Sequence, residues 1–219
     1  MAISNYAELQ TAIVTWMARD GDGDLTSQAP TFIALGESRL NRDLPLRVME
    51  VDTTLTGATS SRELTLPSDF VEPISLHLTT YGDERWLRPF IAGSGPHLTY
   101  LTGNSAPTAW TINGTTIDLD SPCDEAHTFR FRYRKSFALS ASATTNWLLT
   151  NHPDVYLSAG LVEGYQFMKA PEAVSLWEAR YRANVDEVKR KEAKSKQATL
   201  VVDPGLLGVG GYNINTGLA

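Results

Sequence analysis

At both ends of the chain, apolar residues recur every three or four positions, which is the spacing of amphipathic helices. The first predicted helix carries one such stripe, made of Tyr6, Leu9, Ile13, Trp16 and Met17. We expect it to end near Arg19, because the run Asp-Gly-Asp-Gly-Asp follows. A second helix is predicted from just after Ser27 to Pro45, with Pro30 in its first turn, and its inward positions are Phe32, Leu35, Leu40 and Leu44.

Between residues 46 and 145 apolar and polar residues alternate, which is the period of β-strands. The pair Asn113-Gly114 predicts a tight hairpin, because a type I′ turn needs two residues that tolerate positive φ. About seven or eight short strands suit a small antiparallel sandwich or barrel. The candidate strands are Val48–Leu55, Glu63–Leu66, Ile74–Thr79, Arg85–Phe90, Leu98–Leu101, Thr108–Ile112, Thr115–Leu119 and Thr128–Lys135.

The helical period returns after residue 145 and predicts two further helices. One begins at Asn151 to Asp154 and is apolar around much of its circumference, so we expect it to be central; its apolar residues are Leu157, Leu161, Val162, Tyr165, Phe167 and Met168. The other begins at Pro171 and has a narrow apolar seam, made of Val174, Trp177, Tyr181, Val185 and Val188.

These patterns predict an α+β protein, in which a four-helix framework from both chain ends carries an inserted antiparallel β domain. The helical domain spans residues 1–45 and 146–197, the β domain residues 46–145, and an extended C-terminal arm residues 198–219. The arm is too short for another packed layer, yet it contains aliphatic residues among glycines. We therefore expect it to dock outside its own subunit, through Val201, Val202, Leu206, Leu207 and Tyr212.

Charge and composition narrow the function classes. The chain has 219 residues and a net charge of -6, which argues against a generally basic nucleic-acid-binding surface. The single cysteine, Cys123, excludes an intrachain disulfide framework. No apolar stretch approaches the roughly 20 residues that cross a bilayer, and no targeting pattern opens the chain, so we expect no membrane anchor and assembly in the cytoplasm.

Candidate chemistry is sparse. Asp20, Asp22 and Asp24 match the first three ligand positions of an EF-hand loop, but Leu25 and Thr31 stand where that loop needs glycine and glutamate. The four histidines have no metal-binding spacing, and the sequence lacks a nucleophile elbow and a phosphate-binding lysine motif. We therefore expect neither enzymatic activity nor a metal or other cofactor.

Two groups of polar residues are candidate partner contacts. Along Thr128–Lys135 aromatic residues alternate with Arg130, Arg132 and Arg134, which puts rings and guanidinium groups on opposite faces of a strand. We favour rings in the core and arginines at a surface or subunit contact over nucleic-acid stacking, in which rings and cations share one groove. The second group is the polar face of the second helix, either solvent surface or a subunit contact, formed by Glu37, Arg39, Asn41 and Arg42.

Four stretches of the chain also carry a family pattern. They are Tyr6-x-x-Leu9-Gln10, then Phe32-Ile33-x-Leu35-x-Glu37-x-Arg39-Leu40-Asn41-Arg42, then Leu66-Pro67-x-Asp69-Phe70, and finally Asn146-Trp147-Leu148-Leu149 with Pro153-Asp154-x-Tyr156-Leu157. In this order, over roughly residues 5 to 190, they resemble the head-to-tail adaptor proteins of tailed bacteriophages, of the tail tubular protein A type. One departure is that Gly160 and Gly164 stand where this family tends to have alanine.

The resemblance implies a structural virion protein without an active site. It implies a homo-oligomeric ring, which we expect to contain twelve subunits, at the head-tail junction between the portal protein and a tail, nozzle or neck protein. DNA would pass through its channel without specific binding, so we expect an acidic or neutral channel surface. The alternative is a β-domain binding module for a glycan or receptor, with three stacking platforms: Trp86, Tyr100 and Trp110.

Overall fold

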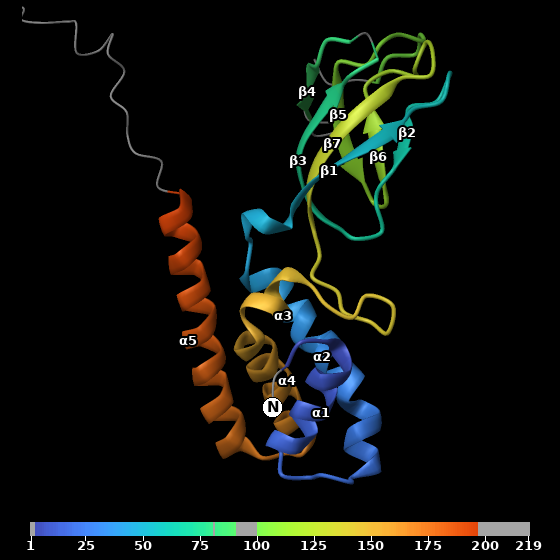
Figure 1. Ribbon diagram of the computed structural model, residues 1–219. Helices are drawn as coiled ribbons and strands as arrows, with labels where there is room; N and C mark the ends of the chain where they lie inside the picture. The colour runs from blue at the N-terminus through green and yellow to red at the C-terminus, as the bar shows by residue number, and fades with distance from the viewer. Residues whose placement is uncertain (1–2, 81, 91–99, 197–219) are drawn as a thin grey trace, which may run out of the picture.

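The computed structural model consists of a helical region and a β region stacked end to end (Figure 1). The structure describes residues 3–80, 82–90 and 100–196, and within these ranges it contains five α-helices and seven strands. The helices come from both ends of the chain and the strands from its middle, so the predicted α+β class is confirmed. The predicted arm, residues 198–219, lies outside the described residues.

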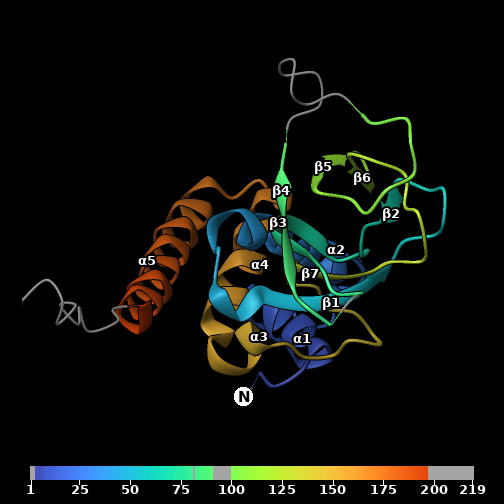
Figure 2. The same ribbon diagram turned by 90° about the horizontal axis from the view of Figure 1, so that it is seen from above.

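Helix α4 (Pro153–Phe167) is the centre of the helical region, as its apolar circumference predicts. It packs against α1 (Tyr6–Trp16), α2 (Gly23–Asp43), α3 (Trp147–Asn151) and α5 (Pro171–Lys196). Seen from above, α5 lies to one side of the molecule (Figure 2). The predicted seam of α5 is buried at four positions, which are Trp177, Tyr181, Val185 and Val188.

Helix α2 begins earlier than the sequence pattern predicts. The Asp22 carboxylate accepts hydrogen bonds from the backbone N–H groups of Asp24 at 3.1 Å and Leu25 at 3.2 Å, and so caps the helix before the predicted start at Ser27. Pro30, expected in the first turn, therefore lies inside α2. Capping by Asp22 outweighs the start signal of the proline, which costs the helix one backbone hydrogen bond.

Helix α3 is a second difference, because the sequence pattern does not predict it. Asn146 caps this short helix by accepting a hydrogen bond from the backbone N–H of Leu149 at 2.9 Å. The described residues therefore contain five helices instead of the predicted four.

Two residues predicted to face inward are about half exposed. Trp16, the last residue of α1, is 52% exposed and lies edge to face against Trp177, with ring centroids 5.6 Å apart. Leu35 is 50% exposed, because its neighbour Gly36 is the residue of α2 that approaches the backbone of α4 at Ala159. Both predictions are wrong because the direction of a helix face depends on the helix that packs against it.

The seven strands form one curled mixed sheet in the order β1-β7-β3-β4-β5-β6-β2. All neighbouring pairs are antiparallel except β4 and β5, which are parallel, so the predicted antiparallel sandwich or barrel is corrected. A parallel pair requires a long crossover, and residues 90–108 supply the necessary length. The strands are β1 (Glu50–Thr56), β2 (Glu63–Thr65), β3 (Phe70–Leu78), β4 (Arg85–Pro89), β5 (Ala109–Asn113), β6 (Thr116–Leu119) and β7 (Thr128–Lys135).

Three predictions within the sheet have different outcomes. Strand β3 begins at Phe70 rather than Ile74, because shifts in its register with β7 on either side of Pro73 accommodate a residue that has no N–H. The predicted hairpin is confirmed between β5 and β6, where Gly114 has a φ of 60°. Of the predicted strand Leu98–Leu101, residues 100 and 101 are not in a strand, and the rest lies outside the described residues.

The alternation of β7 is confirmed. Phe129, Phe131 and Tyr133 are buried in the core of the sheet, and the rings of Phe131 and Tyr133 stack with centroids 5.3 Å apart. The arginines between them point to the other face. The interior of the β region therefore depends on the aromatic residues of this central strand.

Glycines in α4 allow α1 to approach closely. A Cβ atom at Gly160 would lie 2.5 Å from Cδ1 of Ile13, and one at Gly164 would lie 2.8 Å from Sδ of Met17. These distances are shorter than van der Waals contact. Gly160 and Gly164 are thus positions where this chain packs two helices without a side chain between them.

We expect Gly160→Ala to destabilise the protein, although alanine has the higher helix propensity. Overpacking against Ile13 costs about 1–3 kcal/mol, whereas the gain in propensity is about 1 kcal/mol. Replacing Ile13 by valine removes the Cδ1 atom that would clash, so Gly160→Ala should be less destabilising in an Ile13→Val background. Urea unfolding of the four proteins of this cycle measures the coupling, and purely additive effects would contradict the packing account.

Candidate functional site

Two chain segments connect the two regions, and the area where they meet is the candidate functional site. The short 3-10 helix η1 (Arg47–Met49) leads from α2 into β1, and residues 136–146, here called the connector, lead from β7 to α3. Because β1 and β7 are paired strands, the two crossings lie next to each other (Figure 1). The orientation of the β region on the helices depends on how this small area is held.

Asn41 of α2 binds the start of the connector with a reciprocal pair of hydrogen bonds. Its Nδ2 donates to the carbonyl oxygen of Phe137 at 3.1 Å, and its Oδ1 accepts from the N–H of the same residue at 2.6 Å. One side chain thus satisfies both backbone groups of one connector residue. Two such bonds fix direction as well as distance, because hydrogen bonds weaken steeply when they bend.

Glu37, one turn earlier on α2, joins three further elements. The hydroxyl of Tyr156 in α4 donates to Oε1 of Glu37 at 3.1 Å, and Nδ2 of Asn146 donates to the Tyr156 oxygen at 2.6 Å. Asn146 is also the cap of α3, and the backbone of Leu139 in the connector bonds to the Glu37 carboxylate. A buried polar chain therefore runs from α2 through α4 to the end of the connector.

Burial controls the protonation of this chain. Glu37 is only 8% exposed, and the loss of solvation raises the pKa of its carboxyl to about 7, against the opposing effect of the hydrogen bonds from Tyr156 and Leu139. Burial, together with the Glu37 charge, raises the pKa of the Tyr156 hydroxyl, so this hydroxyl remains a donor. The Glu37 carboxyl therefore gains or loses its charge near neutral pH.

The other residues of the predicted polar face of α2 have different surroundings. Arg39 lies 2.6 Å from Oε1 of Glu178 in α5, and its guanidinium stacks over the ring of Tyr181 at 4.2 Å. Hydrogen bonding to Arg39 lowers the pKa of the Glu178 carboxyl. Arg42 is exposed. Of this set, Glu37 is inside the subunit, Arg39 holds α5 against α2, and Arg42 faces solvent; partner contacts here stay a prediction.

The arginines of β7 all have acidic neighbours within the subunit. Arg130 lies 2.7 Å from Glu84, Arg132 lies 2.8 Å from Glu50, and Arg134 pairs with Glu72. The arginines lie on the surface, as predicted, and each charge is balanced by an acidic residue on a nearby strand or loop. A contact of this face with another subunit stays a prediction.

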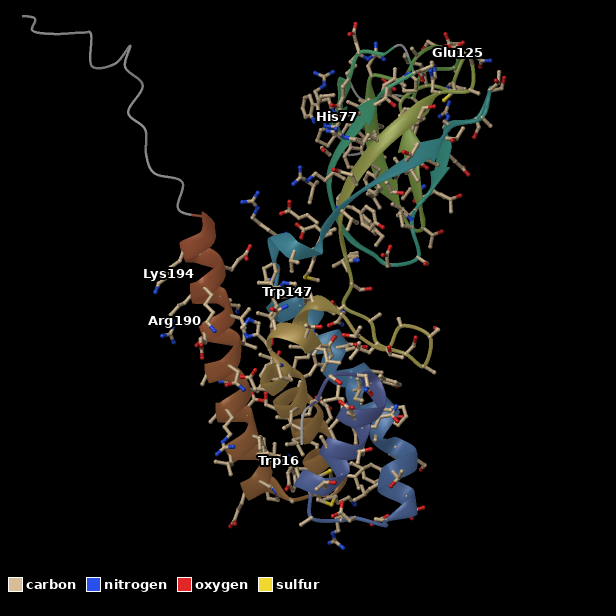
Figure 3. The ribbon with its side chains drawn as sticks, viewed as in Figure 1. Trp16, His77, Glu125, Trp147, Arg190 and Lys194 are labelled. Carbon is tan, nitrogen blue, oxygen red and sulfur yellow. The ribbon has the colours of Figure 1, made fainter. Side chains whose placement is uncertain are left out.

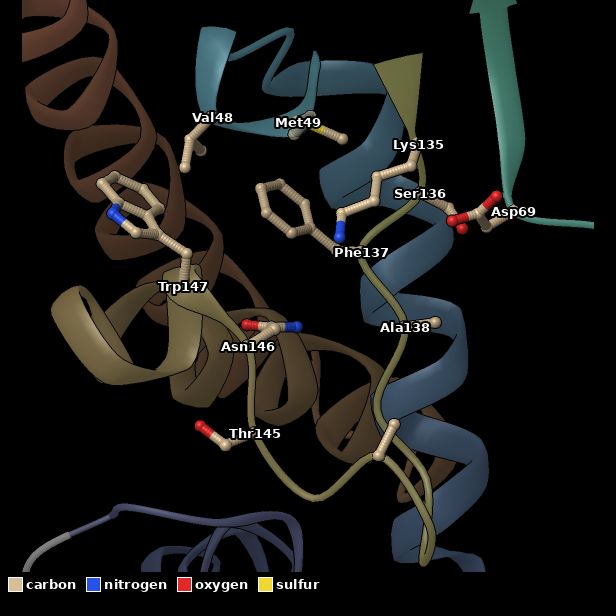
Figure 4. A pocket seen from close by; sticks show the side chains of 11 residues that line it. Val48, Met49, Asp69, Lys135, Ser136, Phe137, Ala138, Thr145, Asn146 and Trp147 are labelled. Carbon is tan, nitrogen blue, oxygen red and sulfur yellow. The ribbon is translucent and has the colours of Figure 1, made fainter. Parts of the chain in front are cut away.

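A pocket lies beside the connector, at the junction of the two regions (Figure 4). Its volume is about 330 Å³. Val48 and Trp147 form one side and Lys135 with Asp69 the other, with the ring of Phe137 between them. Val48 and Trp147 are each 40% exposed, so the apolar side of the pocket opens to solvent.

Other predicted contacts are either outside the described residues or corrected. The arm residues Val201, Val202, Leu206, Leu207 and Tyr212 lie outside the described part of the chain. Trp110, predicted as a stacking platform, is 3% exposed, and its indole N–H donates to the carbonyl of Leu87 at 3.1 Å. That prediction is wrong, because the residue belongs to the core of the sheet, while Trp86 and Tyr100 are exposed.

Two further residues with reactive side chains, Cys123 and His127, are buried in the β region. Burial raises the pKa of the Cys123 thiol, and the His127 ring contacts Asp124 at 2.7 Å and Thr80 at 3.1 Å. Among residues 3–80, 82–90 and 100–196, three or more His, Cys, Asp or Glu side chains nowhere gather so that they could hold a metal ion. Within the same residues, each helix is too short or too polar to cross a membrane.

The sequence pattern did not reveal the junction itself. The sequence pattern places Glu37 and Asn41 on one polar face, and their spacing of four residues does put them on one side of α2. The pattern did not show that the connector binds this face, because the connector has neither helical nor strand periodicity. Tyr156 and Asn146, which complete the chain, appeared only as parts of an apolar helix and of a resemblance motif.

Two comparisons with known proteins bear on this site. The model of the SU10 adaptor protein family matches residues 4–203, a range that includes both regions, η1 and the connector. A search of curated proteins found no match.

We expect the stability of the protein to depend on Glu37 between pH 5 and 8. A raised carboxyl pKa means that the folded state binds more protons than the unfolded state, so this contribution is full below about pH 4.5 and disappears as pH rises through 7. Its size is about 3 kcal/mol, because one pKa unit corresponds to about 1.4 kcal/mol. Urea unfolding should therefore show that Glu37→Gln gains stability relative to wild type as the pH rises, whereas the exposed-site control Glu172→Gln should not; parallel profiles for all three proteins would refute this.

Proposed function

This chain belongs to the SU10 adaptor protein family, a family of phage head-to-tail adaptors, and from that premise we propose that it forms a ring of twelve copies between the capsid portal and the tail. Membership of this family makes the chain a structural protein of a phage virion. The observation that carries the proposal is the extent of the match, which includes the helices, the sheet and both crossings. In this ring one side binds the portal protein and the other a tail, nozzle or neck protein, after assembly in the host cytoplasm.

Exposed apolar side chains support a ring built through the helical region. Helices α2 and α5 flank α4, and Leu35 on α2 and Leu176 on α5 are 50% and 56% exposed. A contact between the α2 flank of one copy and the α5 flank of the next is heterologous, and such contacts close into a ring when the rotation between copies allows it. Burial of these leucines in the contact removes apolar surface from water.

The charge of the β region supports passage of DNA without binding. Residues 46–145 contain eleven acidic and eight basic side chains, and the three arginines of β7 pair with acidic residues. A channel surface that is acidic or neutral lets a polyanion slide without releasing counterions. A channel lined mainly by lysine and arginine would overturn this part of the proposal.

We expect Leu35→Glu and Leu176→Glu each to convert the ring into monomers without unfolding them. Both positions are exposed within the subunit, so the free energy of unfolding should change by no more than about 0.5 kcal/mol. Native mass measurement, alone and with portal-bearing capsids, gives the number of copies. Leu101→Glu, at a 51% exposed leucine of the β region, is the matched control. Rings of wild-type mass from both helical variants would overturn the proposed contact, and a wild-type protein that stays monomeric on the portal would overturn the ring.

Deletion of residues 199–219 should leave a folded monomer that attaches poorly to portal-bearing capsids. Four aliphatic residues of this arm are each worth about 1.5–3 kcal/mol when fully buried, which offsets much of the cost of ordering an extended segment. Sedimentation of capsids with labelled protein measures the attachment. Wild-type affinity of the deleted protein would show that the arm has no part in assembly.

A further inference from the structure

The pocket at the junction has the chemistry of a receptor for a short, mixed apolar and acidic segment. On one side Val48 and Trp147 offer exposed apolar surface, and Phe137 forms the floor between the sides. On the other side the Lys135 side chain extends into the pocket from the end of β7, near Asp69, whose carboxylate accepts a hydrogen bond from the Tyr133 hydroxyl at 2.8 Å (Figure 4). Aromatic and aliphatic surface that is open to solvent beside a cation is typical of a docking site for another protein segment.

The C-terminal arm of the same sequence has a matching pattern. Val201 and Val202 are followed by Asp203, so an extended segment there presents two aliphatic side chains and then a carboxylate. Aliphatic side chains would be buried against Trp147 and Phe137, and the carboxylate would approach the amino group of Lys135. The pocket volume of about 330 Å³ admits side chains of this size but not a folded element.

The last turns of α5, from which the arm continues, lie close to the junction pocket of the same subunit. The backbone N–H of Arg47, the residue before Val48, donates to Oε1 of Glu192 at 2.9 Å, so the last turns of α5 lie beside η1. Arg190 and Lys194 of the same turns point away from the rest of the molecule (Figure 3). An extended chain from residue 197 to 202 can span at most about 20 Å.

We propose that the junction pocket of each subunit receives residues 201–207 from the arm of a neighbouring copy. The inference rests on the proposed ring, in which the α5 flank of one copy meets the α2 flank of the next. Helix α2 leads directly into η1, where the pocket begins. In that ring the end of α5 would therefore lie on the side of the neighbour's pocket. An arm that docks there contacts the connector of the neighbouring subunit. The orientation of that subunit's β region would therefore depend on the assembly of the ring.

Disulfide trapping between two full-length proteins tests this inference. One protein carries Val48→Cys, the other carries Leu206→Cys and a tag that changes its size, and both keep the native Cys123, which is buried and whose thiol pKa is raised. Mild oxidation of the mixed ring should give a covalent heterodimer, at about twice the chain mass of 24.0 kDa. The matched control, Leu101→Cys in place of Val48→Cys, lies at a 51% exposed position of the β region that does not line the pocket and should give none.

The possible results separate this inference from the proposed function. A heterodimer from Val48→Cys and none from Leu101→Cys supports it, and Lys135→Glu should then reduce the yield, with Asp203→Lys restoring it. A ring of wild-type mass without the heterodimer overturns the inference alone. A chain that carries both cysteines and forms only an internal disulfide shows that the arm occupies its own pocket, which also overturns it. Absence of any ring overturns both proposals.

Discussion

The hydrogen bonds from α2 to the connector are the constraint on which the arrangement of the two regions depends. Buried apolar side chains of the described residues gather in two clusters, one among the helices and one within the sheet. Hydrophobic burial has no direction, so two separate cores do not by themselves fix an angle between them. Asn41, with both backbone groups of Phe137, and Glu37, with the backbone of Leu139, supply bonds to the connector that do.

Much of the fold could be predicted because it depends on the local spacing of apolar residues. Four of the five helices, the central place of α4 and the alternation along β7 follow from spacings of three to four or of two residues. The errors have physical causes of longer range. Leu35 turns outward because Gly36 meets α4, the start of α2 is set by the Asp22 cap, and the parallel pair of β4 and β5 depends on a distant crossover.

The site was harder to predict than the fold, because polarity alone does not distinguish surface from buried network. Glu37 and Arg42 are both charged residues of the same predicted polar face. The Glu37 carboxylate is nevertheless buried among the helices, whereas the Arg42 side chain faces solvent. The arginines of β7 look like a binding surface until their acidic partners are placed beside them. Each of these arginines pairs with a carboxylate of its own subunit.

The pairing of β1 with β7 has an evolutionary consequence. Glu50 and Arg134 are directly opposite in the register of these strands, so the chain leaves the helices and returns to them at two points that are only about 5 Å apart. An insertion with adjacent ends makes little demand on the scaffold that carries it, which is why domain insertions succeed at such places. Natural selection can therefore exchange or resize the sheet while the helices keep their sequence pattern and their packing.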